Sequence, residues 1–419
     1  MAAETGTAGR SSGGLAAVAT YTGRRAVALW LFGCCAMIFA MVLIGGITRL
    51  TRSGLSITEW QPLIGVLPPL SESGWAVEFA KYQRIPQYRL VNHGMSLAEF
   101  KTIYLWEYVH RFWGRLIGVA YALPFLYFLW RGWLPRHLRW PLAGIFALGC
   151  GQGLLGWYMV QSGLAERVDV SQYRLVAHLA LALLIYAVTL WTALALWQRP
   201  LRNPSLPFRG EREGPDAWRR EGEVGAHKRS GIRHLTPALS TPGGGGGEWI
   251  WRSAADAVVA LVALTIVAGG FVAGLHAGLT YNTFPLMDGH LVPAGYAQLR
   301  PFVLNWFENV AAVQFNHRLL AMTTIVAVLL LWTAARRRAD LSDGVRRALH
   351  ALLAVTALQM VLGIATLLLV VPVPLAAAHQ AGALLLLTAA IALRHALHHP
   401  LRHAPLPDGQ MDGANRAAL

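Results

Sequence analysis

The sequence predicts an all-α integral membrane protein whose eight transmembrane helices form two parallel-repeat four-helix bundles. Three observations support this prediction. Of the 419 residues, 55% are apolar and 14% are charged, whereas soluble domains contain about 25% charged residues. The apolar residues form eight runs long enough to cross about 30 Å of hydrocarbon at about 1.5 Å per helical residue. Several motifs of the first half also recur in the second half.

The first four runs define an N-terminal unit, residues 26–198. A basic pair, Arg24-Arg25, precedes the first run, which lacks a small-residue cleavage site and is therefore interpreted as a membrane anchor. A long polar segment, 49–103, separates the first run from the second. The C-terminal unit, residues 253–399, repeats this order. The eight expected spans are 26–48, 104–130, 140–163, 174–198, 253–275, 308–334, 346–371 and 374–399.

The segments outside the two units are polar. We expect residues 1–25, rich in Gly, Ala, Ser and Thr, to be a disordered cytoplasmic tail, and residues 400–419 to be a second cytoplasmic tail. Residues 199–252 are highly charged and contain five consecutive glycines, a composition typical of a flexible linker. The ten cations of this linker could bind anionic lipid or nucleic acid, but a solvated insertion between the units is the favoured interpretation.

The distribution of Lys and Arg predicts that both termini lie in the cytoplasm. In that orientation 24 of the 36 Lys and Arg residues lie in cytoplasmic segments and 9 lie on the other side, as the positive-inside rule requires. The polar segments 49–103 and 276–307 then face outward. We therefore expect a multi-pass membrane protein. The lipid bilayer accounts for the net charge of +15, and no nucleic acid is expected as a partner.

An internal duplication relates the two units. Because each unit has an even number of spans, both units enter the membrane from the same side and the repeat is parallel. The duplication predicts two similar functional sites, one in each unit. The aligned motif pairs are GGITRLTRSGLS (45–56) with GGFVAGLHAGLT (269–280), VHRFWGRLIGVA (109–120) with NHRLLAMTTIVA (316–327), and GQGLLGW (151–157) with LQMVLGI (358–364).

Four histidines occupy duplicated positions near the outer ends of the expected spans. His110 and His317 lie in the second helix of each unit, and His178 and His379 lie in the fourth. Intramembrane histidines are costly and usually functional. Two imidazoles at equal depth on facing helices can hold haem iron, so we expect one haem between His110 and His178 and another between His317 and His379. Alternatively, each histidine only hydrogen-bonds a neighbouring helix. A zinc site is disfavoured because no carboxylate or thiolate is repeated beside both pairs.

The two expected sites differ three residues before the first histidine, where Glu107 of the first unit corresponds to Gln314 of the second. Glu107 shares a helix face with its histidine. This carboxylate could be catalytic, or it could form a structural salt bridge with Arg111 or Arg115. Arg111 and Arg318 could contact haem propionates or extend toward the membrane surface. The asymmetry favours one reacting haem and one assisting haem.

These residues stand within longer motifs, through which the chain resembles the haem A synthase family in its alphaproteobacterial and mitochondrial branch. The resemblance covers nearly the whole chain except the tails and residues 199–252, and that segment departs from the short connection expected in the family. The motifs are GGITRLTRSGLSITEWQP (45–62), EFKTIYLWEYVHRFWGRLIG (99–118), GCGQGLLGWYMVQSGL (149–164), VAHLALALLIY (176–186), TYNTFPLMDG (280–289), QFNHRLLA (314–321) and AAAHQAGALLLL (376–387).

The resemblance implies an inner-membrane enzyme that oxidises the C8 methyl group of haem O to the formyl group of haem A for cytochrome oxidase. It implies haem B as cofactor, axial ligation by the four histidines and a catalytic importance of Glu107. From the asymmetry we expect substrate haem O at His110 and His178, and haem B at His317 and His379. Haem O synthase, cytochrome oxidase assembly proteins and a second copy of the chain are the expected protein partners.

The alternative function is a di-haem B membrane electron-transfer protein of cytochrome b type. Both functions need paired histidines. The carboxylate present in one unit only, together with the long outward segments, favours the enzyme. Two further histidines, His93 and His276, are not related by the repeat, and we interpret them as loop or packing residues.

Overall fold

The computed structural model describes residues 9–59, 67–164, 168–198, 245–338 and 341–398. Eight helices within these residues are long and apolar enough to cross a membrane, which confirms the predicted all-α fold with eight spans. The only strand-like pairing among the described residues is an isolated bridge between Met287 and His290. The eight helices are α1 (Gly9–Leu50), α4 (Leu97–Trp130), α5 (Arg136–Leu164), α6 (Gln172–Gln198), α7 (Gly245–Gly274), α9 (Val310–Arg336), α10 (Asp343–Leu368) and α11 (Val373–His398).

Capping side chains explain where several spans begin. α4 begins seven residues before the expected span because Ser96 and Glu99 form a reciprocal capping box. Asn309 accepts hydrogen bonds from two backbone amides in the first turn of α9, and Ser342 caps α10 in the same way. Helices α1 and α7 extend into the expected tail and linker. The rest of that linker, 199–244, and the C-terminal tail lie outside the described residues.

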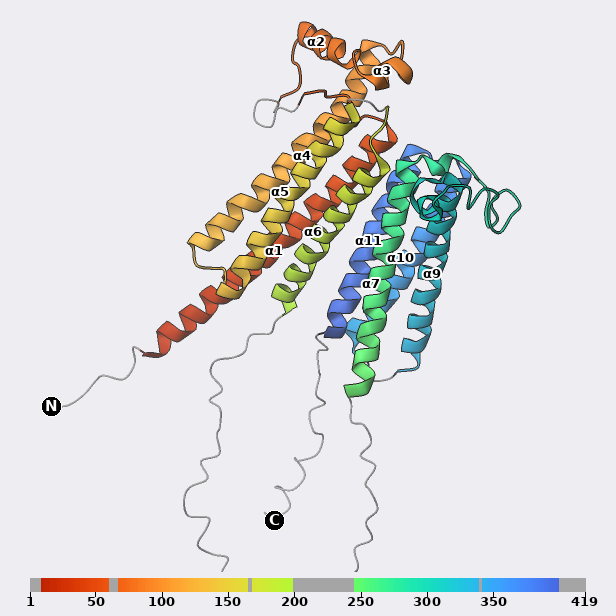
Figure 1. Ribbon diagram of the computed structural model, residues 1–419. Coiled ribbons are helices and arrows are strands. Elements are labelled where there is room, and N and C mark those ends of the chain that lie inside the picture. The colour runs from red at the N-terminus through yellow and green to blue at the C-terminus, as the bar shows by residue number, and fades with distance from the viewer. Residues whose placement is uncertain (1–8, 60–66, 165–167, 199–244, 339–340, 399–419) are drawn as a thin grey trace, which may run out of the picture.

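The four long helices of each half make the same set of neighbour contacts. In the first half α1 packs against α4 and α6, and α5 closes the ring by contacting α4 and α6. In the second half α7 packs against α9 and α11, and α10 contacts α9 and α11. Figure 1 shows the two groups side by side. The helices that correspond in sequence therefore hold corresponding places in the packing.

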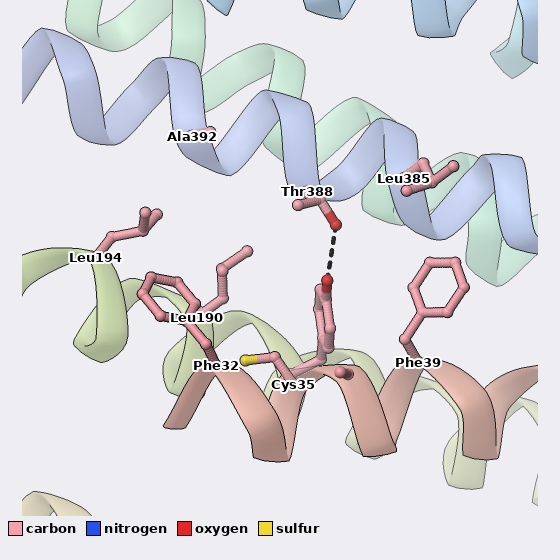
Figure 2. Close-up of a pocket in the computed structure, with 10 residues that line it drawn as sticks. Phe32, Cys35, Phe39, Leu190, Leu194, Leu385, Thr388 and Ala392 are labelled. Carbon is pink, nitrogen blue, oxygen red and sulfur yellow. Dashed lines mark hydrogen bonds between the residues drawn. The ribbon is translucent and has the colours of Figure 1, made fainter. Parts of the chain in front are cut away.

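The two halves meet through the first and fourth helices of each. α6 contacts α7, α1 contacts α11, and α6 contacts α11. An apolar groove of about 520 Å³ lies between α1, α6 and α11, with Phe32, Cys35 and Leu190 among its lining residues (Figure 2). The hydroxyl groups of Tyr186 and Thr388 hydrogen-bond across this groove at 2.8 Å. A side-chain hydrogen bond thus crosses this apolar groove, and Gln380 of α11 also donates to the carbonyl oxygen of Val42 in α1 at 3.0 Å.

Polar loops cover one end of both bundles, called here the loop end (upper part of Figure 1). In the first half the loop carries α2 (Glu72–Tyr82) and α3 (Pro86–Leu90), whose aromatic residues pack on the start of α4. Tyr82 and Phe100 are fully buried in this cluster. The second loop, 275–309, contains three short helical turns: Ala277–Leu279, Phe302–Leu304 and α8 (Asn305–Glu308).

The turn after the first helix is also repeated. Arg52 and His276 are equivalent in the aligned motifs, and both adopt the left-handed conformation, with φ of 54° and 52°. At the opposite end, an arginine of the first helix donates to a last-turn carbonyl of the fourth helix in each half: Arg24 to Leu196 (3.0 Å) and Arg252 to Leu397 (3.2 Å). The turn thus repeats at aligned positions, whereas the two arginines make a similar contact from positions that differ by four residues in the alignment.

Candidate functional site

The four predicted histidines lie in the helical turns that follow the loop end. His178, His317 and His379 stand six or seven residues after the start of α6, α9 and α11, and His110 stands 13 residues after the start of α4. His110 and His178 lie within range of each other's charge, as do His317 and His379. These are the two pairs predicted from the sequence, and the binding of a haem by each pair stays a prediction.

In each of the four histidine rings the Nδ1 atom is turned toward the protein interior. The side chains are partly exposed, yet the Nδ1 atoms of His110, His178 and His379 are buried without a hydrogen-bond partner. The Nδ1 of His317 lies 3.1 Å from the carbonyl oxygen of Thr265. A carbonyl only accepts, so this Nδ1 carries the proton and Nε2 keeps its lone pair. That is the tautomer in which a histidine coordinates a metal through Nε2.

Glu107 is 2% exposed and its carboxylate is fully engaged. Oε1 accepts from Nε and Nη2 of Arg111, at 3.0 and 2.6 Å. Oε2 accepts from the hydroxyl of Ser56 and the backbone amide of Ile57, at 2.7 and 2.8 Å. Four donors around one buried group favour a charged carboxylate. Glu107 therefore ties the loop that follows α1 to the helix that bears His110.

Gln314 likewise joins the loop to its helix in the second half, but it donates hydrogen bonds to the loop where Glu107 accepts them. Its Nε2 donates to the carbonyl oxygens of Ala277 and Thr280, both at 2.6 Å. Its Oε1 accepts from Arg318 at 2.8 Å. Gln314 is also 2% exposed. Where the first half offers the loop an acceptor, the second half offers it a donor.

The two arginines that follow the histidines bind loop carbonyls. The accepting residues occupy equivalent positions of the aligned motifs, so the clamp is duplicated together with the histidines. These hydrogen bonds occupy part of each guanidinium group. The haem propionate contacts expected for the same two arginines stay a prediction. Arg111 donates to Glu59 (3.1 Å) and Ile57 (2.9 Å), and Arg318 donates to Thr283 (2.8 Å) and Tyr281 (2.6 Å).

An ionic cluster that the sequence did not predict joins the halves at the loop end. Arg49 at the end of α1 contacts Asp169 and His276, both at 2.9 Å, and the carbonyl of Gly274 at 3.1 Å. His276 also lies 2.9 Å from Asp169. Burial raises the pKa of Asp169, but the His276 hydrogen bond and the Arg49 charge outweigh burial and hold this pKa below its usual value. His276 is thus part of a polar contact between α7 and the first half.

The donor set suits a metal whose other ligands come from a macrocycle. Among the described residues there is no group of three or more His, Cys, Asp or Glu side chains that could hold a bare ion. Each half instead offers two histidines, which is the number of axial positions of a haem iron. The fold and these residues together define a multi-pass membrane protein with a duplicated histidine-pair site.

Comparison with known proteins identifies the family to which this chain belongs. The chain belongs to the COX15-CtaA family of cytochrome oxidase assembly proteins, whose model matches residues 28–219 and 242–391. This confirms the resemblance inferred from the motifs. The chain is 49% identical over 374 residues to the heme A synthase of Nitrosospira multiformis, an alignment that covers 89% of this chain and 94% of the relative.

Two further relatives show how widely the similarity extends. The heme A synthase of Rhodospirillum centenum is 49% identical over 377 residues, covering 90% of this chain and 89% of the relative. The heme A synthase COX15 of Arabidopsis thaliana is 43% identical over 380 residues, covering 89% of this chain and 75% of the relative. The similarity therefore includes both bacterial and plant proteins.

Proposed function

We propose that this protein is a haem A synthase, which oxidises the C8 methyl group of haem O to the formyl group of haem A for cytochrome oxidase. The observation that carries the proposal is the similarity to proteins of that name, 43 to 49% identical over about 90% of the chain. The duplicated histidine pairs supply the chemistry such an enzyme needs. Membrane location suits a substrate that carries a long prenyl chain.

We further propose that haem B is the bound cofactor. His317 and His379 would hold its iron, and His110 and His178 would hold haem O. The tautomer of His317 and the presence of two electrostatically coupled histidines in each half fit axial ligation. When bound, haem B supplies one-electron redox chemistry. The assignment of substrate to the first half rests on the asymmetry between Glu107 and Gln314.

The residues around His110 position the ligand helix and its covering loop. Glu107 and Arg111 fasten residues 56–59 over this part of α4. The aromatic cluster beneath α2 and α3 packs against the first two turns of the same helix. A carboxylate so placed could exchange a proton with the reacting group, and this catalytic role of Glu107 is part of the proposal. Its four contacts also support the second alternative, a structural ion pair with Arg111.

The proposed location is the inner membrane, with both termini in the cytoplasm and the loop end outside. This orientation follows from the excess of Lys and Arg in the connections at the terminal end. Both haem sites would then lie in the outer half of the bilayer. Haem O synthase and cytochrome oxidase assembly proteins are the proposed partners, because one makes the substrate and the others receive the product. A homo-oligomer is also proposed.

The decisive experiment expresses the chain in a host that makes haem O but no haem A. The membrane haems are extracted and separated by chromatography. Haem A or its hydroxymethyl precursor should appear with the wild-type chain and disappear with His110→Ala and His178→Ala. If haem O stays unchanged while only tightly bound haem B copurifies, the di-haem electron-transfer protein becomes the better account.

The role of Glu107 is tested in the same host with Glu107→Gln. Loss of haem A with unchanged bound haem and unchanged thermal stability would support a catalytic role. Loss of haem A together with lower stability would support the structural ion pair. Formation of haem A at the normal rate would remove Glu107 from the proposed mechanism.

A further inference from the structure

Each of the four histidines packs against a glycine on the preceding helix of its bundle ring. A methyl group placed at that glycine would lie far inside the usual carbon contact distance of about 3.5 to 4.0 Å. The glycines come from α1, α5, α7 and α10, and they align in pairs between the two halves. From the added methyl carbon to the histidine Cε1 the distances are 3.0 Å for Gly45 and His110, 3.1 Å for Gly156 and His178, 3.0 Å for Gly269 and His317, and 2.8 Å for Gly363 and His379.

Other glycines of the same helices either face open space or meet a different residue. A methyl group at Gly33 of α1, or at Gly149 or Gly153 of α5, would have no atom within 4 Å, and one at Gly344 of α10 would meet only the Ser342 hydroxyl, at 3.9 Å. By contrast, Gly46 of α1 lies against Gln380, Gly163 of α5 against Leu55, and Gly270 of α7 against Val176. Close contact alone therefore does not set the four glycines apart; what they share is that the nearest atom in each case is the Cε1 of a duplicated histidine.

A second contact accompanies the glycine on the third helix of each half. Gln152 stands four residues before Gly156, on the same face of α5, and its Nε2 donates to the backbone carbonyl of His178 at 3.0 Å. Gln359 stands four residues before Gly363 and donates to the carbonyl of His379, also at 3.0 Å. The third helix thus fixes both the backbone and the ring of each of these histidines.

We propose that Gly45, Gly156, Gly269 and Gly363 are positioning residues that set the orientation of the four histidine rings toward the two haems. This inference rests on the proposed role of the histidines as iron ligands. The neighbouring helix touches the ring at Cε1, the carbon between its two nitrogens. Rotation or retreat of the ring therefore moves the coordinating nitrogen. A side chain at the glycine position forces such a movement, because the opposing helix backbone cannot recede without unpacking the bundle.

The first test compares alanine substitutions on the same helix. Gly156→Ala is matched by Gly153→Ala on α5, and Gly363→Ala is matched by Gly344→Ala on α10. Full-length protein is purified from the haem O-producing host. Haem per protein and the electron paramagnetic resonance of the low-spin ferric haems are then measured. This resonance reports the orientation of the axial imidazoles, which a purely structural packing role would leave unchanged.

We expect both glycines facing a histidine to shift the resonance and to weaken haem retention about tenfold, as for other residues that support a metal ligand. The two matched substitutions should leave the resonance and the haem content at the wild-type level. The proposal is overturned if substitution of either facing glycine leaves the resonance at its wild-type position in folded protein. If His379→Ala itself retains all the bound haem, the proposed ligation fails instead.

A second test works even if the substituted protein binds no haem. Gly363→Ala is introduced into the wild-type chain and into His379→Ala, and thermal unfolding is measured for all four proteins after haem removal. The three atoms nearest the methyl group all belong to the ring, so most of its destabilising effect should vanish when the ring is absent. An equal loss of stability in both backgrounds would mean that Gly363 only allows α10 and α11 to pack closely, and would overturn the proposal.

Discussion

Glu107 and Gln314 occupy the same position in the two halves and bind their loops with opposite hydrogen-bond polarity. Glu107 accepts from Ser56 and Ile57, whereas Gln314 donates to Ala277 and Thr280. An arginine one turn later binds the remaining side-chain oxygen in both cases. The difference between the halves therefore extends beyond one side chain to the loop that each side chain holds.

This polarity predicts that Gln314→Glu is more harmful than the reverse exchange. A carboxylate at position 314 would face two carbonyl oxygens at hydrogen-bond distance and would offer a donor to neither. The expected loss of stability is about 3 kcal/mol, since the carbonyl oxygen of Thr280 loses its donor and both carbonyl oxygens then lie beside a buried charge. Thermal unfolding of the purified protein measures it.

Gln298→Glu, in the exposed part of the same loop, makes the same chemical change without buried contacts and should leave stability near the wild-type value. A Gln314→Glu protein as stable as this control would contradict the polarity argument.

The Asp169 cluster predicts acid sensitivity of the contact between the halves. The folded pKa of Asp169 is depressed by His276 and Arg49. Its contribution to stability is therefore fully present above the unfolded value of about 4 and is lost as the pH falls through the lower folded value.

The stability difference between wild type and Asp169→Asn should be smaller below about pH 4 than at pH 5, because the carboxylate is then increasingly protonated. Thermal unfolding across this range provides the measurement. Glu72→Gln, on the exposed first turn of α2, serves as the control. A difference that persists unchanged at pH 3 would refute the role of the charged carboxylate.

The Tyr186–Thr388 hydrogen bond predicts a measurable coupling between the halves. Tyr186→Phe and Thr388→Val each remove one partner, and the double substitution removes both. We expect a coupling free energy of about 0.6 to 1 kcal/mol, the range found for hydrogen bonds between membrane helices. A double-mutant cycle on thermal stability gives this value. Additive effects of the two substitutions would show that the groove is held by apolar contacts alone.

The proposed assignment of haem O to one histidine pair and haem B to the other predicts that substitutions in the two pairs have different effects. His317→Ala and His379→Ala should abolish retention of haem B, because each leaves its iron with a single axial ligand. His110→Ala and His178→Ala should keep haem B but stop the conversion of haem O. Haem extraction and chromatography of the four purified variants distinguish these outcomes. Loss of haem B from the His110 or His178 variant would reverse the assignment of the two sites.

Hydropathy and duplication allowed most of the fold to be predicted. The expected spans 174–198 and 374–399 differ from α6 and α11 by two residues or fewer at each end, because the polar residues that stop these helices are visible in the sequence. The start of α4 was missed by seven residues because a capping box outside the apolar run extends the helix. The places of the four histidines near the loop end were predictable because helical position fixes depth and the repeat fixes which helices correspond, whereas their pairing around a haem stays a prediction.

The partners of the charged residues were less predictable. Arg111 and Arg318 bind loop carbonyls more than 30 residues away, and a backbone acceptor leaves no signature in the side-chain sequence. His276 was interpreted as a loop or packing residue because its counterpart in the first half is Arg52. Its contact with Asp169 depends on how the two halves dock, which a motif comparison within one chain does not describe.

The contacts between the halves have the symmetry of a dimer interface. Exchanging the halves converts the contact of α1 with α11 into the contact of α7 with α6, and both contacts exist. An assembly of two identical four-helix subunits would satisfy this pattern, yet every substitution in it would appear twice. Because the two halves belong to one chain, each position can change alone. Covalent fusion is what permits an acid at residue 107 and an amide at residue 314, and hence two unequal sites in one symmetric frame.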